Sequence, residues 1–265
     1  MHDLVRRASL RVVKTAYPSY GLRSSDVILG AFPKSGSTWI RFILANLISL
    51  RELEGVEVNY HLINGPLVAA YDSHRFPTIP YSSIPRFVVT HLPYRRRRFG
   101  RYRSLHLLRN PGDTMVSLYE YIKARTDKHR FRGSFSDLLR DPKRGVAAWC
   151  AHVRSWRPAA DATITFEDLQ RDAPTAIASV FTALEIGLPP RSVLDQAIER
   201  SSFQAIRTVE EEKGLDARAR GHLATGFRFA RRGIVGEWRE AFTADDLRFL
   251  NHSLERGGLA EFQLS

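Results

Sequence analysis

The sequence predicts a single α/β domain in which a central parallel sheet is flanked by helices. Short apolar runs that predict buried strands alternate with longer segments of helical periodicity along most of the chain. Neither an internal repeat nor a low-complexity linker interrupts this order, so we expect one domain over 26–265 behind an N-terminal arm, 1–25. The predicted strands lie at 26–32, 86–92, 104–109 and 162–166, and the predicted helices at 38–50, 113–124, 145–159 and 174–186.

Turn and cap residues set the expected boundaries of these elements. Asp113 is the expected N-cap of the helix that follows the third strand, and Pro174 and Gly187 bound the helix after the fourth. The region 51–85 carries prolines and glycines among weak patterns, which is typical of a variable, substrate-facing segment. Beyond residue 190 the chain is expected to be mainly helical or irregular.

The charge balance favours an anionic partner. Lys and Arg number 40 against 28 Asp and Glu, which gives a net charge of +12. Such a surplus attracts nucleic acid, a membrane surface, or a small ligand with several phosphates. The segment 94–103 holds six arginines among aromatic residues. It fits a solvated loop, a grip on nucleic acid, or a site that recruits an anionic acceptor, and these three interpretations remain open.

The single cysteine, Cys150, bears on the cellular compartment. It excludes an internal disulfide framework and fits a reducing environment, so we expect a cytoplasmic protein. Its apolar helical surroundings predict core packing rather than catalysis. No apolar run reaches the roughly 18 residues of a membrane span. The basic arm lacks the apolar centre of a secretory signal, and we expect it to pack on the domain, with a surface helix on anionic lipid as the alternative.

The first candidate site is GAFPKSGSTW (30–39), where a strand runs through a tight turn into a helix. A glycine in the turn permits close backbone approach, and the first N–H groups of the helix point at any anion bound there. Hydroxyls and an ammonium add charge-assisted hydrogen bonds. The segment therefore predicts a phosphate loop built from Lys34, Ser35, Gly36, Ser37 and Thr38.

This loop differs from the Walker A motif, in which the lysine follows the second glycine. Here Lys34 precedes Gly36, and no convincing acidic ligand for Mg²⁺ stands at a later strand end. The pattern favours a phosphorylated ligand that binds without a metal. A small-molecule P-loop kinase, which needs ATP and Mg²⁺, is the alternative enzyme.

The motif PKSGSTW resembles the loop with which sulfotransferases bind the 5′-phosphosulfate end of 3′-phosphoadenosine 5′-phosphosulfate (PAPS). The resemblance spans roughly 26–243 in four ordered motifs and is closest to the cytosolic-type enzymes, including bacterial ones. It implies a P-loop-like α/β fold. It also implies that the loop residues through Trp39 contact PAPS, and that Lys34 stabilises charge on the bridging oxygen during transfer.

A second motif, RNPGDTMVS (109–117), follows the third predicted strand. An arginine offers planar, bidentate donors to a phosphate, and a hydroxyl one turn into the helix can bind a further oxygen. In the sulfotransferase family this pattern is the 3′-phosphate site, which the resemblance places at Arg109 and Ser117. Two separate phosphate sites distinguish PAPS from common nucleotides.

Three further segments resemble the family's nucleotide contacts. FRFARRGIVGEW (227–238) resembles the segment that wraps the 3′-phosphate and covers the adenine, and SSF (201–203) resembles a motif near the adenine. FEDL (166–169) resembles a motif that usually begins with tyrosine, so its phenylalanine lacks the hydroxyl that would contact the nucleotide. The residues that the resemblance implies here are Phe166, Ser201, Phe203, Phe229, Arg231, Arg232 and Gly233.

The segment FVVTHLP (87–93) resembles the family's K-T-H-L-P, which implies that His91 is the general base. An imidazole with an unperturbed pKa of about 6.5 can take the proton of the acceptor hydroxyl as its oxygen attacks sulfur in line. The family's lysine two residues earlier is Val89 here, as expected for a continuously buried strand. The resemblance also implies that Ser117 holds Lys34 away until the acceptor is bound.

The sequence therefore predicts a sulfotransferase that moves a sulfuryl group from PAPS to an acceptor hydroxyl, releases 3′,5′-ADP and uses no metal. The expected acceptor is a small molecule, a glycan or a lipid. Nucleic acid is not the expected partner, whereas peripheral membrane contact and the oligomeric state stay open. A non-enzymatic nucleic-acid-binding protein is the alternative from another class, because the +12 charge would serve it, but it leaves the spaced phosphate motifs unexplained.

Overall fold

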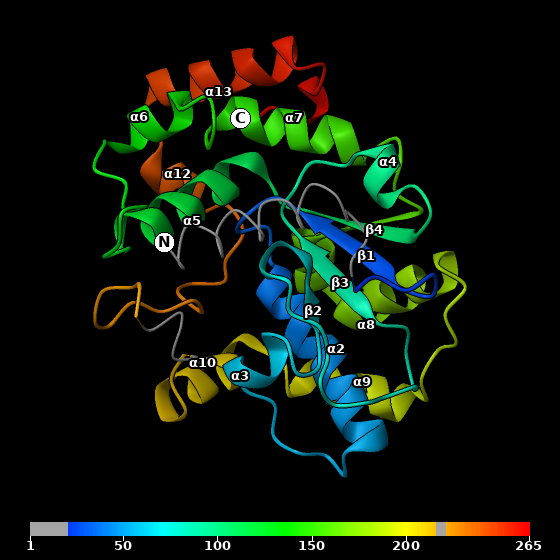
Figure 1. The fold of residues 1–265 in the computed structure, drawn as a ribbon. Helices are drawn as coiled ribbons and strands as arrows, with labels where there is room; N and C mark the ends of the chain where they lie inside the picture. Colours follow the sequence, from blue (N-terminus) through cyan, green and yellow to red (C-terminus); the bar gives the residue numbers. More distant parts are fainter. Residues whose placement is uncertain (1–20, 216–220) are drawn as a thin grey trace, which may run out of the picture.

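The computed structural model describes residues 21–215 and 221–265 (Figure 1), so most of the expected N-terminal arm, 1–20, lies outside the described residues. The strands are β1 (Val27–Ala31), β2 (Ala69–Ala70), β3 (Phe87–Thr90), β4 (Arg103–Leu108) and β5 (Ala162–Thr165). The helices are α2 (Ser37–Glu52), α3 (Tyr60–Ile63), η1 (Tyr71–Ser73), α4 (Arg96–Phe99), α5 (Pro111–Lys123), α6 (Phe135–Arg140), α7 (Val146–Trp156), α8 (Phe166–Ala183), α9 (Arg191–Glu199), α10 (Phe203–Glu212), α12 (Trp238–Ala241), α13 (Ala244–Arg256) and η2 (Ala260–Phe262).

The strands form one five-stranded sheet in the order β2-β3-β1-β4-β5, and every neighbouring pair is parallel. The predicted parallel α/β architecture is thereby confirmed. The four predicted strands are present within one to two residues of their expected ends. The fifth, β2, was not predicted because two residues in a weakly patterned region give no periodic signal.

Alternate residues of β1 pack on opposite faces of the sheet. Val27 and Leu29 belong to the core that the sheet shares with α2, α8 and α9. Ile28 belongs to a smaller cluster with Trp156 of α7 and Phe99 of α4. Helices therefore cover both faces, with α2, α8 and α9 on one side of the sheet and α7 and α13 on the other (Figure 1).

The strand order creates a crevice at the carboxyl end of β1. The chain leaves β1 toward β2 and β3 on one side, and it leaves the neighbouring β4 toward β5 on the other side. Adjacent loops that diverge in this way leave a gap at the carboxyl edge of a parallel sheet, which is where such folds bind ligands. The phosphate loop follows β1 and Arg109 follows β4, so both predicted phosphate sites flank this crevice.

Two helix starts differ from the prediction. Asn110, not Asp113, is the N-cap of α5, because its side chain accepts the Asp113 N–H at 3.2 Å and Pro111 occupies the first helical turn. Helix α8 begins at Phe166 rather than at Pro174, because Thr165 caps the FEDL turn. The predicted start corresponds to a kink inside α8, where Asp172 leaves helical geometry.

Cys150 is buried in the core between α7 and α13, which confirms its predicted packing role. Burial raises the pKa of its thiol to about 11, so the reactive thiolate is disfavoured. Within the described ranges, the structure contains no helix that is both long and apolar enough to cross a bilayer.

Candidate active site

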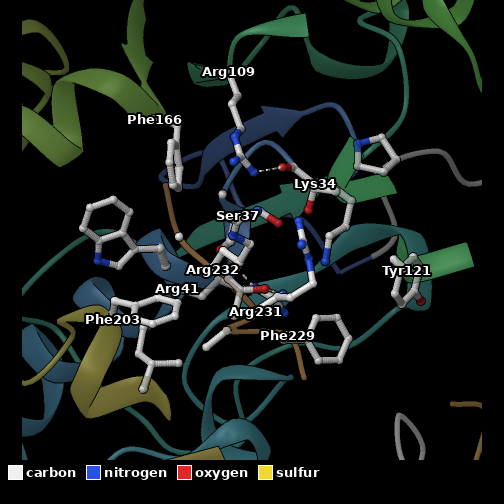
Figure 2. Close-up of a pocket in the computed structure, with 18 of the residues that line it drawn as sticks. Lys34, Ser37, Arg41, Arg109, Tyr121, Phe166, Phe203, Phe229, Arg231 and Arg232 are labelled. Atoms are coloured by element: carbon white, nitrogen blue, oxygen red, sulfur yellow. Dashed lines mark hydrogen bonds between the residues drawn. The ribbon is translucent and has the colours of Figure 1, made fainter. Parts of the chain in front are cut away.

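A cavity of about 440 Å³ lies at the crevice between β1 and β4 (Figure 2). Its walls come from the ends of four strands and from the five helices α2, α3, α5, α8 and α10, so residues far apart in the sequence meet there. The structure brings both predicted phosphate sites and the predicted base to this one cavity. The predicted site residues that line it are Lys34, Gly36, Ser37, Thr38, Trp39, His91, Arg109, Ser117, Phe166, Phe203, Phe229, Arg231, Arg232 and Gly233.

The loop after β1 presents the start of helix α2 to the cavity. Gly36, the N-cap of α2, has φ 101°, and the helix begins with no side-chain cap and no acidic residue in its first turn. The first N–H groups of α2 are therefore not bound by a capping side chain and can bind an anion. A Cβ on Gly36 would come within 2.8 Å of the Phe166 ring, so both the positive φ and this close approach require glycine.

The ammonium group of Lys34 lies among aromatic rings and other cations. Its Nζ is 4.8 Å from the centre of the Phe229 ring and 5.0 Å from that of the Tyr121 ring. Burial, followed by the charges of Arg109 and Arg231, lowers the pKa of Lys34 from 10.5 to about 7. Cations gathered this closely in a shielded cavity favour an anionic ligand, whose charge would offset their repulsion.

Arg109, at the end of β4, is only 7% exposed and is held from three sides. Its guanidinium donates to the carbonyl oxygens of Lys34 and Ile234, each at 3.3 Å. The same group lies 4.3 Å from the centre of the Phe166 ring. These contacts fix the plane of the guanidinium, which suits bidentate phosphate binding. Phe166 thus supports Arg109 through its ring, a role that needs no hydroxyl.

Residues 227–237, which we call the strap, cross the cavity without forming a helix or strand. Arg231 forms a two-bond ion pair with the buried Glu237, each bond 2.5 Å long. Arg232 pairs with Glu240 at 2.6 Å. Gly233 packs so closely on Phe203 that a Cβ would come within 2.5 Å of the ring. Arg231 and Arg232 both line the cavity, and we call them the strap arginines. Both already have carboxylate partners, which a phosphate would have to replace or share.

The imidazole of His91 faces the cavity and is held through its Nδ1. That nitrogen donates to the Ala31 carbonyl oxygen at 2.8 Å, which leaves Nε2 as a proton acceptor. Asp72 of η1 accepts hydrogen bonds from the His91 N–H at 2.8 Å and from the Thr90 hydroxyl at 2.6 Å, which fixes the turn after β3. Burial lowers the pKa of His91 below 6.5, although Ala31 and Asp72 oppose this effect. The imidazole is therefore neutral at pH 7, as a general base must be.

Two predicted site residues do not line the cavity. The fully buried Ser201 donates to the Ala197 carbonyl at 2.7 Å and accepts from Asn46 Nδ2 at 3.0 Å, so its hydroxyl joins α9 to α2. Its position does not support the predicted contact with the adenine. Ser35, within the phosphate loop, is 1% exposed and is the one residue of the predicted loop that does not line the cavity. Of the SSF motif, the phenylalanine, Phe203, reaches the cavity.

The cavity residues that the sequence did not mark include three with charged or polar side chains, Arg41, Tyr121 and Glu237. The spacing of residues along a predicted helix could have identified two of them. Arg41 lies four residues after Ser37, and Tyr121 lies four residues after Ser117, so each shares a helix face with a predicted site residue. Val89, which stands where the family has a lysine, is buried in β3 as predicted.

Comparison with known families decides what kind of protein carries this cavity. The sulfotransferase domain model matches residues 24–257. The chain belongs to the sulfotransferase family. This sulfotransferase is 26% identical over 239 residues to sulfotransferase 6B1 of Gorilla gorilla gorilla, with 86% of this chain and 74% of that protein covered. It is also 22% identical over 245 residues to a 3-alpha-hydroxysteroid sulfotransferase of Cavia porcellus, and the match covers 89% of this chain and 84% of that protein. The matches confirm the predicted enzyme class, a sulfotransferase, and do not support the two alternatives, a small-molecule kinase and a nucleic-acid-binding protein.

Solved structures confirm the predicted fold of the sulfotransferase. Retinol dehydratase in a complex with retinol and PAP superposes with a TM-score of 0.68 at 19% identity, covering 95% of this chain and 86% of that one. Mouse sulfotransferase SULT7A1 complexed with PAP superposes with a TM-score of 0.65 at 19% identity, covering 91% and 88%.

Proposed function

We propose that this sulfotransferase transfers the sulfuryl group of PAPS to a hydroxyl of a small-molecule acceptor, with 3′,5′-ADP as the leaving product. One observation carries the proposal: two separate cationic phosphate positions and a neutral histidine open into the same cavity. Relatives named for a hydroxysteroid and structures named for PAP support the same chemistry.

The cavity offers each part of the nucleotide a place. The phosphosulfate would bind at the start of α2, near Lys34 and Ser37, where helix N–H groups and an ammonium converge. The 3′-phosphate would bind between Arg109, Ser117 and the strap arginines. The adenine would lie by the rings of Trp39 and Phe203, which also line the cavity. We place Phe229 at the sulfuryl end rather than over the adenine, because its ring faces the Lys34 ammonium (Figure 2).

The transfer itself would use His91 and Lys34. The acceptor hydroxyl loses its proton to Nε2 of His91 as its oxygen attacks sulfur in line, forming one S–O bond while the bond to the 5′-phosphate oxygen breaks. The Lys34 ammonium stabilises the charge that grows on that leaving oxygen. Ser117 lines the same cavity, and its role in restraining Lys34 stays a prediction from the family resemblance.

We expect nucleotide binding to change the protonation of Lys34. A bound phosphosulfate or phosphate would raise the lowered pKa of about 7 toward its usual range, because the anion favours the ammonium form. At pH 8 the uptake should approach about one proton per 3′,5′-ADP. Isothermal titration in buffers with different ionisation enthalpies measures this number directly. The Lys34→Ala variant should show no such uptake, and a wild-type enthalpy independent of the buffer would contradict the prediction.

Arg109→Ala tests the second phosphate position. We expect the affinity for 3′,5′-ADP to fall about 10- to 100-fold, because a buried, charge-assisted bidentate contact is lost. The affinity for 5′-AMP, which lacks the 3′-phosphate, should change by less than about twofold. Arg191→Ala on α9, whose exposed side chain pairs with Asp195, is the matched control. Equal losses for both nucleotides would place the 3′-phosphate elsewhere.

The acceptor is expected to approach between aromatic walls. Tyr60, Tyr121 and Phe229 line the cavity beside Lys34 and His91, which favours an apolar or aromatic body next to the reacting hydroxyl. A small-molecule acceptor is therefore preferred over a glycan. A lipid acceptor, contact with a membrane surface and a cytoplasmic location stay predictions from the sequence.

A further inference from the structure

Glu210, near the end of α10, is a buried carboxylate that the sequence motifs did not mark. It is 7% exposed and does not line the cavity. Its Oε1 accepts the N–H of Phe229 at 2.6 Å, and its Oε2 accepts the N–H of Ala230 at 3.0 Å. The hydroxyl of Tyr60 donates to Oε2 at a longer 3.3 Å. One carboxylate thus holds the beginning of the strap against α10 and α3.

This anchoring matters because the strap has no regular secondary structure of its own. Backbone N–H groups in such a segment need other partners, and charged acceptors form the strongest of these hydrogen bonds. At the far end of the strap, Asp113 plays the same part by accepting the N–H groups of Gly236 at 2.8 Å and Trp238 at 3.0 Å. The two carboxylates together fix where the strap arginines and Phe229 lie over the cavity.

Glu210 also acts on Lys34 through its charge. The groups that surround Lys34 come from several elements: Arg41 on α2, Arg109 at the end of β4 and Arg231 on the strap each disfavour its ammonium form. Glu210 is the group that opposes them and raises the pKa of Lys34. Lys34 in turn is one of the charges that lower the pKa of His91. The carboxylate therefore offsets part of the repulsion among the cavity cations.

We propose that Glu210 is a positioning residue for sulfuryl transfer, which fixes the strap over the nucleotide and keeps Lys34 in its ammonium form. This inference rests on the proposed function of Lys34. The carboxylate touches neither nucleotide nor acceptor, and it acts through the Phe229 and Ala230 backbone and through the electrostatic potential at Lys34.

The test compares Glu210→Gln with Glu212→Gln, which makes the same chemical change at an exposed position of the same helix. We expect Glu210→Gln to weaken 3′,5′-ADP binding about tenfold at pH 7. Its affinity should also begin to fall at a lower pH than in the wild type, because Lys34 loses its proton earlier. Amide exchange at 229–230 should become faster. Binding, pH dependence and exchange equal to those of Glu212→Gln would overturn the proposal.

Glu210→Asp separates charge from geometry and guards against a variant that fails to fold. It keeps the negative charge on a shorter side chain, so we expect the wild-type pH dependence with faster amide exchange at 229–230. The same shift in pH dependence as in Glu210→Gln would refute the electrostatic role. Near-ultraviolet circular dichroism confirms that each variant is folded. A wild-type protein that does not prefer 3′,5′-ADP over 5′-AMP would refute the proposed function instead.

Discussion

Replacement of His91 by alanine is expected to lower kcat by about 10²- to 10⁴-fold, the contribution typical of a general base. The lone pair of Nε2, which the bond from Nδ1 to Ala31 leaves available, disappears with the imidazole. Affinity for 3′,5′-ADP should stay within about twofold, because the proposed binding mode places the phosphate groups at other side chains. Radiolabelled sulfuryl transfer from PAPS and calorimetric titration measure the two quantities separately.

The control for this variant is His252→Ala on α13, an exposed histidine outside the cavity, which should keep full activity. Turnover of His91→Ala near the wild-type rate would remove the general base from the mechanism. A large loss of nucleotide affinity would show instead that the imidazole supports the nucleotide site. A loss of kcat with nucleotide affinity retained is the expected outcome, because the imidazole of His91 is neutral and its Nε2 is left available as a proton acceptor.

Lys34→Ala is expected to damage both binding and chemistry. The ammonium lies beside the phosphate loop, so its loss should weaken 3′,5′-ADP about tenfold. It should also lower kcat by about 10²- to 10³-fold, as measured when one donor to a developing oxyanion is removed. The Lys34 variant should therefore lose both nucleotide affinity and kcat, whereas the His91 variant should lose kcat alone.

Lys123→Ala is the matched control for this change. Its ammonium also faces an aromatic ring, that of Tyr119 at 5.3 Å, but the side chain is exposed on the last turn of α5. We expect wild-type binding and turnover. If Lys34→Ala lost affinity with an unchanged kcat, the lysine would bind the nucleotide without stabilising the leaving oxygen.

Four of the strands and the three site residues at their ends could be predicted, because the signals for them lie in short local stretches of sequence. Apolar runs located β1, β3, β4 and β5, and their carboxyl ends located Lys34, His91 and Arg109. In a parallel sheet the carboxyl ends share one edge, so residues at three strand ends must lie close together. The family resemblance then supplied their chemical roles.

The remaining features depend on contacts that local sequence does not encode. Glu210 and Asp72 act through backbone N–H groups of segments about 20 residues away, and neither pairing leaves a periodic pattern. Ser201 fits the motif in sequence but points into the interface of two helices. Asp113 was predicted to cap its own helix, yet its carboxylate binds the strap more than 100 residues later. Tertiary packing decided each of these positions.

We expect the cavity to hold a nucleotide with two separate phosphates, and calorimetric titration of the wild-type protein measures this directly. The titrants are 3′,5′-ADP, 5′-AMP and ATP with Mg²⁺ under one set of conditions. We expect clear preference for 3′,5′-ADP, because in the proposed binding mode Arg109, Arg231 and Arg232 hold the 3′-phosphate while Lys34 and the start of α2 hold the 5′ end. Equal affinity for all three nucleotides, or preference for ATP with Mg²⁺, would contradict it.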